Sequence, residues 1–266
     1  MKKKLLSLFA VVFTAFLLVG CSSSSNSSKK TTTLKIGASA VPHAQILRHV
    51  APELKKEGVN LKITTFQDYT MPNKALANGE LDANYFQHVP FLKLWNKQNH
   101  GTLVNAGGVH LEPIAVFSKK VKRLQDLKKG ATIIVSSNVP DYGRILQIFK
   151  DAGLITLKKG IDITSANFSD IASNPRHLKF KHSYEPKLLP TIYKNGEGDA
   201  VVINANYAVG AGLNPIKQSI AIEKRNSPYV NIIAVRADDQ SAPWAKALVA
   251  LDEAVSSRLQ GELKAE

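Results

Sequence analysis

The sequence has a single cysteine, Cys21, among its 266 residues. It contains no Gly-x-Ser-x-Gly motif and no His-Glu-x-x-His motif, which mark common serine-nucleophile and zinc hydrolase sites. Cys21 lies near the N-terminus, so no cysteine remains for catalysis inside a folded domain. We therefore expect that the protein is not an enzyme and that it needs no cofactor.

Only one long stretch of the chain is apolar. Three lysines at positions 2–4 precede a run without charge from Leu5 to Val19. This run is too short and wrongly flanked for a stable membrane span, and it predicts a secretory signal peptide over residues 1–20. The sequence Leu-Val-Gly-Cys that ends at Cys21 resembles a lipobox, so we expect cleavage before Cys21 and lipid on its thiol. The alternative is an ordinary signal peptide followed by a chance cysteine.

The stretch after Cys21, "SSSSNSSKKTTT", has no apolar residue at all. It can bury nothing, so residues 21–32 are predicted to form a lipidated, flexible tether. A lipid at one end and a folded domain at the other predict a protein held at the extracytoplasmic face of the cell membrane. Such a protein does not span the membrane.

Acidic residues are scarce relative to basic ones. The chain has 21 Asp and Glu against 35 Lys and Arg, for a net charge of +14, which falls to +11 when the three lysines at 2–4 leave with the signal peptide. The lysines are scattered in pairs, and there is no arginine-rich run or nucleic-acid motif. We interpret this charge as a solvated surface that faces an anionic membrane or wall, and we expect no nucleic-acid partner.

The rest of the chain alternates between strand-like and helix-like segments. Strand patterns occur in "TLKIGAS", "VNLKITTF", "ATIIVSS" and "YVNIIAVR", and amphipathic helical patterns occur in "HAQILRHVAPELKK" and "DYGRILQIFKDAGL". This alternation is typical of an α/β protein with mostly parallel sheets. Breaks near 117–120 and after "VVINANYA" suggest that the chain leaves one lobe, builds a second and returns. We expect 33–117 plus 216–266 in lobe 1 and 118–215 in lobe 2, in the manner of periplasmic binding proteins.

Ligands in open α/β sheets bind beyond the carboxyl ends of strands. In "LDANYFQHVP" we expect a strand over 81–84, so that 85–88 forms its carboxyl end. Aromatic rings next to hydrogen-bonding groups are typical of a small-molecule pocket. Candidate ligand-binding residues here are Asn84, Phe86 and His88. Tyr69 follows the preceding strand, and His110 follows a glycine pair and is expected to precede a strand.

Arg144 is expected in the first turn of a helix, where the helix dipole disfavours a cation. An arginine in this place is reasonable if it grips an anion, such as the carboxylate of an amino acid or peptide. The alternative is a salt bridge to Asp141 or Asp151. Asn204 and Asn206 follow another strand and can bind both ammonium and carboxylate groups, although one of the two can equally be a turn residue.

Two other classes of protein remain open at this point. His43, His88 and His110 could converge on zinc, as in metal-binding lipoproteins. However, the sequence has no His-x-His pair and no histidines four residues apart, so we expect no metal site. The other class is a surface protein that uses the fold for adhesion or scaffolding.

Six long stretches resemble the methionine-binding lipoprotein family (the NlpA type), the substrate-binding components of methionine ABC importers. They are "VPHAQILRHVAPELKKEGVNLKI", "FQDYTMPNKALANGELDANYFQHVPFL", "VHLEPIAVFSKK", "GRILQIFKDAGLI", "VINANYAVGAGLNP" and "SPYVNIIAVR". They match in order and cover nearly all of residues 34–236.

The resemblance implies two α/β lobes, joined by two crossing segments, that close over a free amino acid. It implies the permease and ATPase subunits of an importer as partners, and we expect the binding protein to be a monomer. The arginine that matches Arg144 takes the ligand carboxylate, and an asparagine within 204–206 takes the amino acid backbone. The positions that line the ligand's side chain match Tyr69, Phe86, His88 and His110.

The sequence departs from the family pattern close to this expected site. Family members usually carry a Pro-Asn-Asp-Pro-type turn before the arginine, whereas this chain reads "VSSNVPDYGR". His182 also stands where an acidic residue is common. The resemblance therefore implies L-methionine, a closely related amino acid or a methionine dipeptide as the ligand.

Overall fold

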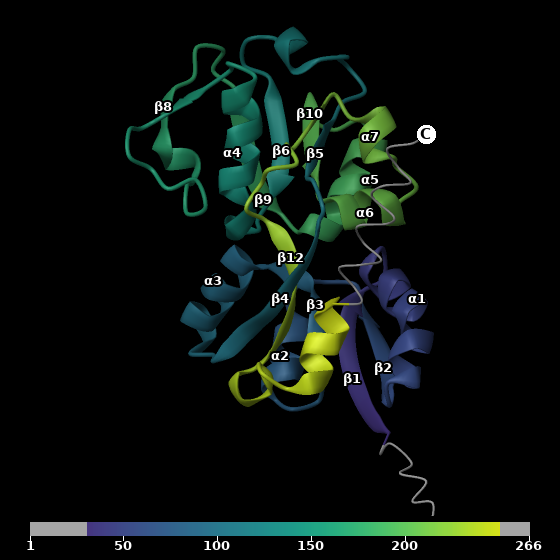
Figure 1. Cartoon of the computed structure of the whole chain (residues 1–266). Coiled ribbons are helices and arrows are strands. Elements are labelled where there is room, and N and C mark those ends of the chain that lie inside the picture. Colours follow the sequence, from purple (N-terminus) through teal and green to yellow (C-terminus); the bar gives the residue numbers. More distant parts are fainter. Residues whose placement is uncertain (1–30, 251–266) are drawn as a thin grey trace, which may run out of the picture. The chain divides into compact units, whose positions relative to one another are not determined.

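The computed structural model describes residues 31–250, which form two α/β lobes, each built on a five-stranded sheet (Figure 1). The fold class predicted from the sequence is confirmed. The signal peptide, Cys21 and most of the tether lie outside the described residues, as does the chain after residue 250. Within 31–250, no helix combines the length and the apolar character needed to cross a membrane.

The first sheet has the strand order β2-β1-β3-β12-β4. β1 pairs in parallel with β2 and β3, whereas β12 is antiparallel to both β3 and β4. The strands are β1 (Thr32–Ser39), β2 (Val59–Phe66), β3 (Ala83–His88), β4 (Leu103–Leu111) and β12 (Val230–Arg236). We call this sheet and its helices the first lobe. β12 follows the whole second lobe in sequence, so the chain returns to complete the first sheet.

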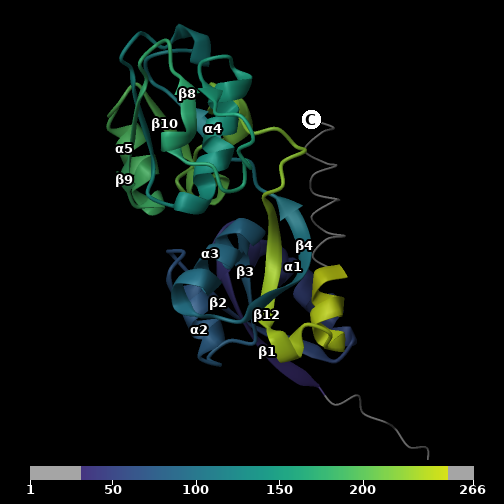
Figure 2. The same ribbon diagram turned by 90° about the vertical axis from the view of Figure 1, so that its left-hand side faces the viewer.

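Helices cover both faces of the first sheet (Figure 2). α1 (His43–Lys56) and the helix at 243–250 pack on one face, where Leu47, Leu54 and Leu248 are fully buried. α2 (Met71–Ala77) and α3 (Val89–Asn99) pack on the other face around Leu76 and Leu92. Burial of these apolar side chains provides the main driving force that holds the layers together.

The second sheet has the order β11-β5-β10-β6-β9. β6 is parallel to β10 and β9, and β5 is antiparallel to β10 and β11. The strands are β5 (Ala115–Phe117), β6 (Thr132–Ser136), β9 (Lys179–Tyr184), β10 (Ala200–Ile203) and β11 (Ala221–Ile222). Side chains alternate along the strands, so Ile133 and Val135 pack on one face while Ile134 packs on the other. We call this sheet and its helices the second lobe.

Helices also cover both faces of the second sheet. α4 (Tyr142–Asp151) packs on one face, and α5 (Leu189–Lys194) and α6 (Ala205–Gly210) pack on the other. The remaining elements are short: α7 (Pro215–Gln218), the β7 (Thr156–Leu157) and β8 (Ile171–Ser173) pair, and the 3-10 turns η1 (Leu124–Asp126), η2 (Val139–Asp141), η3 (Phe168–Asp170), η4 (Pro186–Leu188) and η5 (Ala237–Asp239).

Two segments, 112–114 and 223–229, connect the sheets, and we call them the first and second crossings. The sequence division at 117/118 and 215/216 would assign β5 and β11 to lobe 1. The structure corrects this, because both strands hydrogen-bond within the second sheet. Only three residues separate β4 from β5, and β11 is only two residues long, so the pattern did not mark either boundary.

Other expectations also change in the structure. Both sheets are mixed rather than mostly parallel, because β12 and β5 run against their neighbours. The strand in "LDANYFQHVP" extends to His88 rather than ending at residue 84. His110 precedes the strand β5, as expected, but it also lies within β4, a strand that the pattern did not reveal.

Candidate ligand-binding site

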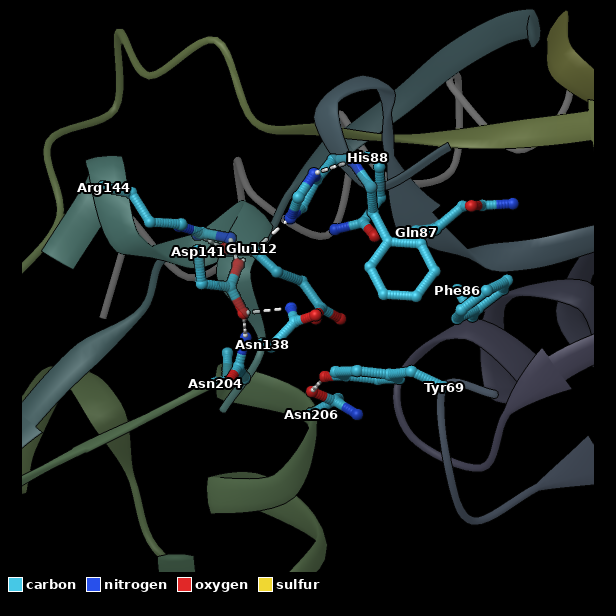
Figure 3. A pocket seen from close by; sticks show the side chains of 13 residues that line it. Tyr69, Phe86, Gln87, His88, Glu112, Asn138, Asp141, Arg144, Asn204 and Asn206 are labelled. Atoms are coloured by element: carbon cyan, nitrogen blue, oxygen red, sulfur yellow. Dashed lines mark hydrogen bonds and ion pairs between the residues drawn. The ribbon is translucent and has the colours of Figure 1, made fainter. Parts of the chain in front are cut away.

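A pocket lies where residues of both lobes meet the first crossing (Figure 3). It holds about 350 Å³ of space not occupied by protein atoms, including the opening to solvent. Its lining residues are Tyr69, Phe86, Gln87, His88, Phe91, Glu112, Asn138, Asp141, Arg144, Asn204, Ala205, Asn206 and Asn231.

Aromatic rings form one wall of the pocket. Tyr69 lies 5.9 Å from Phe86 and 6.1 Å from Phe91, measured between ring centroids, and the two phenylalanines are 5.6 Å apart. Phe86 extends from the central strand β3, and Phe91 from the first turn of α3. This wall is suited to an aliphatic chain or a thioether, since sulfur makes favourable contacts with aromatic rings.

On the polar side of the pocket, Asp141 contacts three other lining residues. Its carboxylate accepts hydrogen bonds from Nδ2 of Asn138 at 2.6 Å and Nδ2 of Asn204 at 3.0 Å, and it pairs with Nε2 of His88 at 3.1 Å. Burial alone would raise the pKa of this carboxyl group, but His88 and Arg144 outweigh burial and hold the pKa well below its usual value. Asp141 is therefore an ionised, fully buried carboxylate at neutral pH.

Asn204 uses only half of its hydrogen-bonding capacity. Its Nδ2 donates to Asp141, but its Oδ1 is buried with no hydrogen-bond partner among the described residues. A buried acceptor that is left unpaired costs free energy, about 1–3 kcal/mol. Because Asn204 lines the pocket, a ligand that donates a hydrogen bond to Oδ1 would recover this cost.

Arg144 enters the pocket from the first turn of α4. Its Nε and Nη2 donate to Oε2 of Glu223, and Nη2 also donates to the backbone oxygen of Glu112. Nη1 lies 3.6 Å from Oδ1 of Asp141 and makes no hydrogen bond with the described residues. Burial opposes the charge of the guanidinium, but Glu223 and Asp141 raise its pKa, so it stays protonated.

Asp141 is thus one partner of Arg144, as one interpretation of the sequence proposed. Asp151, the other acidic residue considered, pairs instead with Lys224 at 2.8 Å. The main partner, Glu223, was not expected, because it lies 79 residues away on the second crossing. No pattern in the sequence indicated that the two would meet.

Behind the pocket, Glu112 lies between two buried histidines. Its Oε1 is 3.2 Å from Nε2 of His110 and 3.6 Å from Nδ1 of His43. Burial lowers the pKa of His43 to about 4, so this ring is neutral at pH 7. Burial disfavours the charge on Glu112, but His43, His110 and Arg144 together lower its pKa. Glu112 therefore presents a carboxylate to the pocket.

These three side chains also have the donor types of a metal site, with ligand atoms within 4.8 Å of one another. His88, the third histidine considered from the sequence, is not part of this group, because it pairs with Asp141. The outer ring nitrogens of His43 and His110 contact Asn231 Oδ1 and the Tyr85 hydroxyl. Of the two histidines only His110 hydrogen-bonds Glu112, and Nδ1 of His43 is buried with no hydrogen-bond partner among the described residues.

Six of the eight ligand-binding residues predicted from the sequence line the pocket. Their contact with a ligand stays a prediction. They come from four separate segments: Tyr69, Phe86, His88, Arg144, Asn204 and Asn206. Asn84 and His110 do not line it. Asn84 is buried in β3, where its amide bonds Asn73 and Gln87, and His110 lies behind Glu112.

Seven further residues line the pocket that were not expected from the sequence: Gln87, Phe91, Glu112, Asn138, Asp141, Ala205 and Asn231. Asp141 and Asn138 had a usable signal, since they lie in the turn that leads into the helix of Arg144. Glu112 had none, because it follows a strand that the pattern did not reveal.

Two α/β lobes, two crossings and a pocket with a charged side and an aromatic side define the class of two-lobed substrate-binding proteins. The model for the family described as "NlpA lipoprotein" matches residues 34–260. The chain therefore belongs to the NlpA lipoprotein family.

Individual relatives agree with this assignment. The chain is 45% identical over 251 residues to the methionine-binding lipoprotein MetQ of Bacillus subtilis, covering 94% of this chain and 91% of the relative. A solved nutrient-binding protein from Burkholderia cenocepacia, bound to methionine, is 42% identical with a TM-score of 0.77, covering 83% and 91% of the two chains. An ABC transporter periplasmic substrate-binding protein from Coxiella burnetii is 38% identical with a TM-score of 0.77, covering 82% and 91%.

Proposed function

We propose that this protein is a lipid-anchored, extracytoplasmic binding protein that captures L-methionine and delivers it to an ABC importer. One observation carries the proposal. The pocket offers one buried acceptor, Asn204 Oδ1, and one guanidinium edge, Arg144 Nη1, that the described residues leave without hydrogen bonds. A free amino acid carries the complementary pair of groups, an ammonium and a carboxylate. The similarity to proteins named as methionine-binding supports the choice of amino acid.

The carboxylate of the ligand would bind at Arg144 Nη1. Nε and Nη2 of the guanidinium are engaged by Glu223 and by the backbone of Glu112, whereas Nη1 makes only the 3.6 Å ion pair with Asp141. A carboxylate here would make a charge-assisted hydrogen bond, which is roughly twice as strong as a hydrogen bond between neutral groups.

The ammonium of the ligand would bind at Asn204 Oδ1 and the Glu112 carboxylate. Asp141 adds a second buried negative charge on the same side. Glu112 and Asp141 together exceed the single positive charge of Arg144, so an anion without an ammonium group would be repelled. The pocket is therefore expected to select zwitterions.

The side chain of methionine would lie against Tyr69, Phe86 and Phe91. These rings pack against one another and present an apolar surface that suits an unbranched, flexible chain. A longer ligand, such as a methionine dipeptide, is a second candidate. A wider groove of about 1370 Å³, open solvent included, shares Tyr69, Phe91 and Asn138 with the pocket and could take the additional residue.

Binding would act by closing the lobes. Tyr69 and Phe86 belong to the first lobe, while Arg144 and Asn204 belong to the second, so a ligand that contacts all four favours the closed state. The closed protein would then dock on the permease, which works with an ATPase subunit. The lipid on Cys21 would keep the protein at the membrane and raise its concentration near the permease.

The test is a thermal-shift screen of the mature chain from Cys21, unfolded and refolded to remove bound ligand. The panel contains the twenty amino acids, D-methionine, short methionine peptides and zinc. A ligand that binds only the folded state raises the unfolding midpoint with concentration. We expect the largest shift with L-methionine. A shift with zinc alone, or with none of the panel, would refute the proposed function.

A further inference from the structure

Contacts on several sides hold the guanidinium of Arg144. Nε and Nη2 both donate to Oε2 of Glu223, and Nη2 donates in addition to the Glu112 backbone oxygen. The ring of Tyr229 covers the guanidinium, with Cζ 5.0 Å from the ring centroid. Nη1 makes no hydrogen bond with the described residues and lies 3.6 Å from Oδ1 of Asp141. The direction in which Nη1 points is therefore fixed by the contacts on the opposite edge.

Glu223 is itself held in place. The backbone N–H of Ile114 donates to Oε2 at 3.0 Å, and the Ser227 hydroxyl donates to Oε1. Glu223 is 8% exposed, and the 114 and 223 backbones are joined again by a hydrogen bond from Glu223 N to Ile114 O at 3.0 Å. One carboxylate thus connects α4 with both crossings.

From this arrangement we propose that Glu223 is a positioning residue for ligand binding. It does not line the pocket, but it fixes the guanidinium of Arg144 so that Nη1 meets the ligand's carboxylate. It also ties that guanidinium to the two segments that connect the lobes. This inference rests on the proposed function, because it assumes that the ligand carries a carboxylate.

Geometry, and not charge, is what Glu223 contributes. Its negative charge opposes binding of a second carboxylate to the same guanidinium, so charge alone would make Glu223 unfavourable. A glutamine can keep the contacts, since its Oε1 can accept from Arg144 and Ile114 while its Nε2 faces Ser227. An aspartate keeps the charge but is one methylene shorter, so it cannot reach the guanidinium and Ile114 in the same way.

The two substitutions therefore separate position from charge. Calorimetric titrations would compare L-methionine with L-methioninamide, which keeps the ammonium and the thioether but lacks the carboxylate charge. The quantity of interest is the ratio of the two affinities in wild type, Glu223→Asp and Glu223→Gln. Glu53→Asp, an exposed carboxylate of α1 that pairs with Lys56, is the matched control.

We expect Glu223→Asp to lower the preference for methionine over its amide by at least about tenfold, equivalent to about 1.4 kcal/mol. Glu223→Gln should keep or raise the preference, and the control should match wild type. A preference unchanged in Glu223→Asp, or an equal loss for both ligands, would overturn the positioning role. An equal loss in Glu223→Gln and Glu223→Asp would assign the effect to charge and overturn it as well. If wild type binds neither ligand, the proposed function fails and this inference fails with it.

Discussion

The hydroxyl of Tyr69 donates a hydrogen bond to Oδ1 of Asn206 across the pocket, at an O···O distance of 2.7 Å. Tyr69 follows β2 in the first lobe, and Asn206 lies in α6 of the second lobe. A second bond between the lobes runs from the Tyr207 hydroxyl to the Gln67 backbone oxygen at 3.3 Å. The two lobes are therefore joined directly at the mouth of the pocket as well as through the crossings.

Replacing Tyr69 by phenylalanine keeps the aromatic wall but removes this bond between the lobes. A hydrogen bond of this kind contributes about 1 kcal/mol, so L-methionine should bind roughly fivefold more weakly. Isothermal titration calorimetry measures the change. Tyr193→Phe is the control, because Tyr193 packs on Phe117 within the second lobe. Equal affinities for wild type and Tyr69→Phe would show that the bond does not favour the ligand-bound state.

Replacing Arg144 by alanine removes the proposed carboxylate contact. Loss of a charged hydrogen bond of about 2 kcal/mol predicts at least about thirtyfold weaker binding of L-methionine. The variant should also be less stable, because Glu223 is left buried without its cation. Arg123→Ala, on the exposed surface, serves as the control for both effects. A folded Arg144→Ala protein that binds as tightly as wild type would disprove the carboxylate assignment.

The deaminated analogue of methionine keeps the thioether chain and the carboxylate but has no ammonium group. It should bind at least about thirtyfold more weakly than methionine, since a charged hydrogen bond is worth about 2 kcal/mol. Asn204 Oδ1 would stay unpaired, and Glu112 and Asp141 would repel the added anion. A competition titration against methionine measures this difference. Comparable affinity for the two compounds would contradict the ammonium site.

Acid should destabilise the fold partly through His43, which faces Glu112, His110, Tyr85 and Asn231. Burial lowers the pKa of His43 from 6.5 to about 4. The unfolded chain therefore binds a proton that the folded chain does not, so stability is present above pH 6.5 and is lost as the pH falls toward 4. The expected contribution is on the order of 3 kcal/mol.

Urea unfolding at several values between pH 7 and pH 4 would measure this contribution. His43→Gln should show a flatter dependence of the unfolding free energy on pH over this window. His49→Gln, an exposed position on the same helix, should behave as wild type. A His43→Gln protein with the full wild-type dependence would assign the acid sensitivity to other groups.

The two-lobed α/β fold could be predicted from the sequence because strand and helix periodicities are local. Alternating segments such as those at β1 and β2 and the amphipathic face of α4 are visible without any tertiary information. The lobe boundaries could not be predicted in the same way. β11 has two residues and β5 has three, and their membership of the second sheet depends on hydrogen bonds to distant strands.

The site, like the lobe boundaries, could be predicted from the sequence only in part. Tyr69, Phe86 and His88 could be found because polar and aromatic residues at strand ends are unusual. Asn84 looked similar in sequence, yet its side-chain amide is buried and hydrogen-bonded to Asn73 and Gln87. Glu223 could not be found, because its role arises only when the second crossing meets α4.

The measurement that tests the central claim most directly is a crystal structure of the mature chain with L-methionine. The account predicts the carboxylate within hydrogen-bond distance of Arg144 Nη1 and the ammonium at Asn204 Oδ1 and Glu112. The thioether should contact Tyr69, Phe86 and Phe91. Methionine bound in the reverse orientation, or in another cavity, would contradict the account.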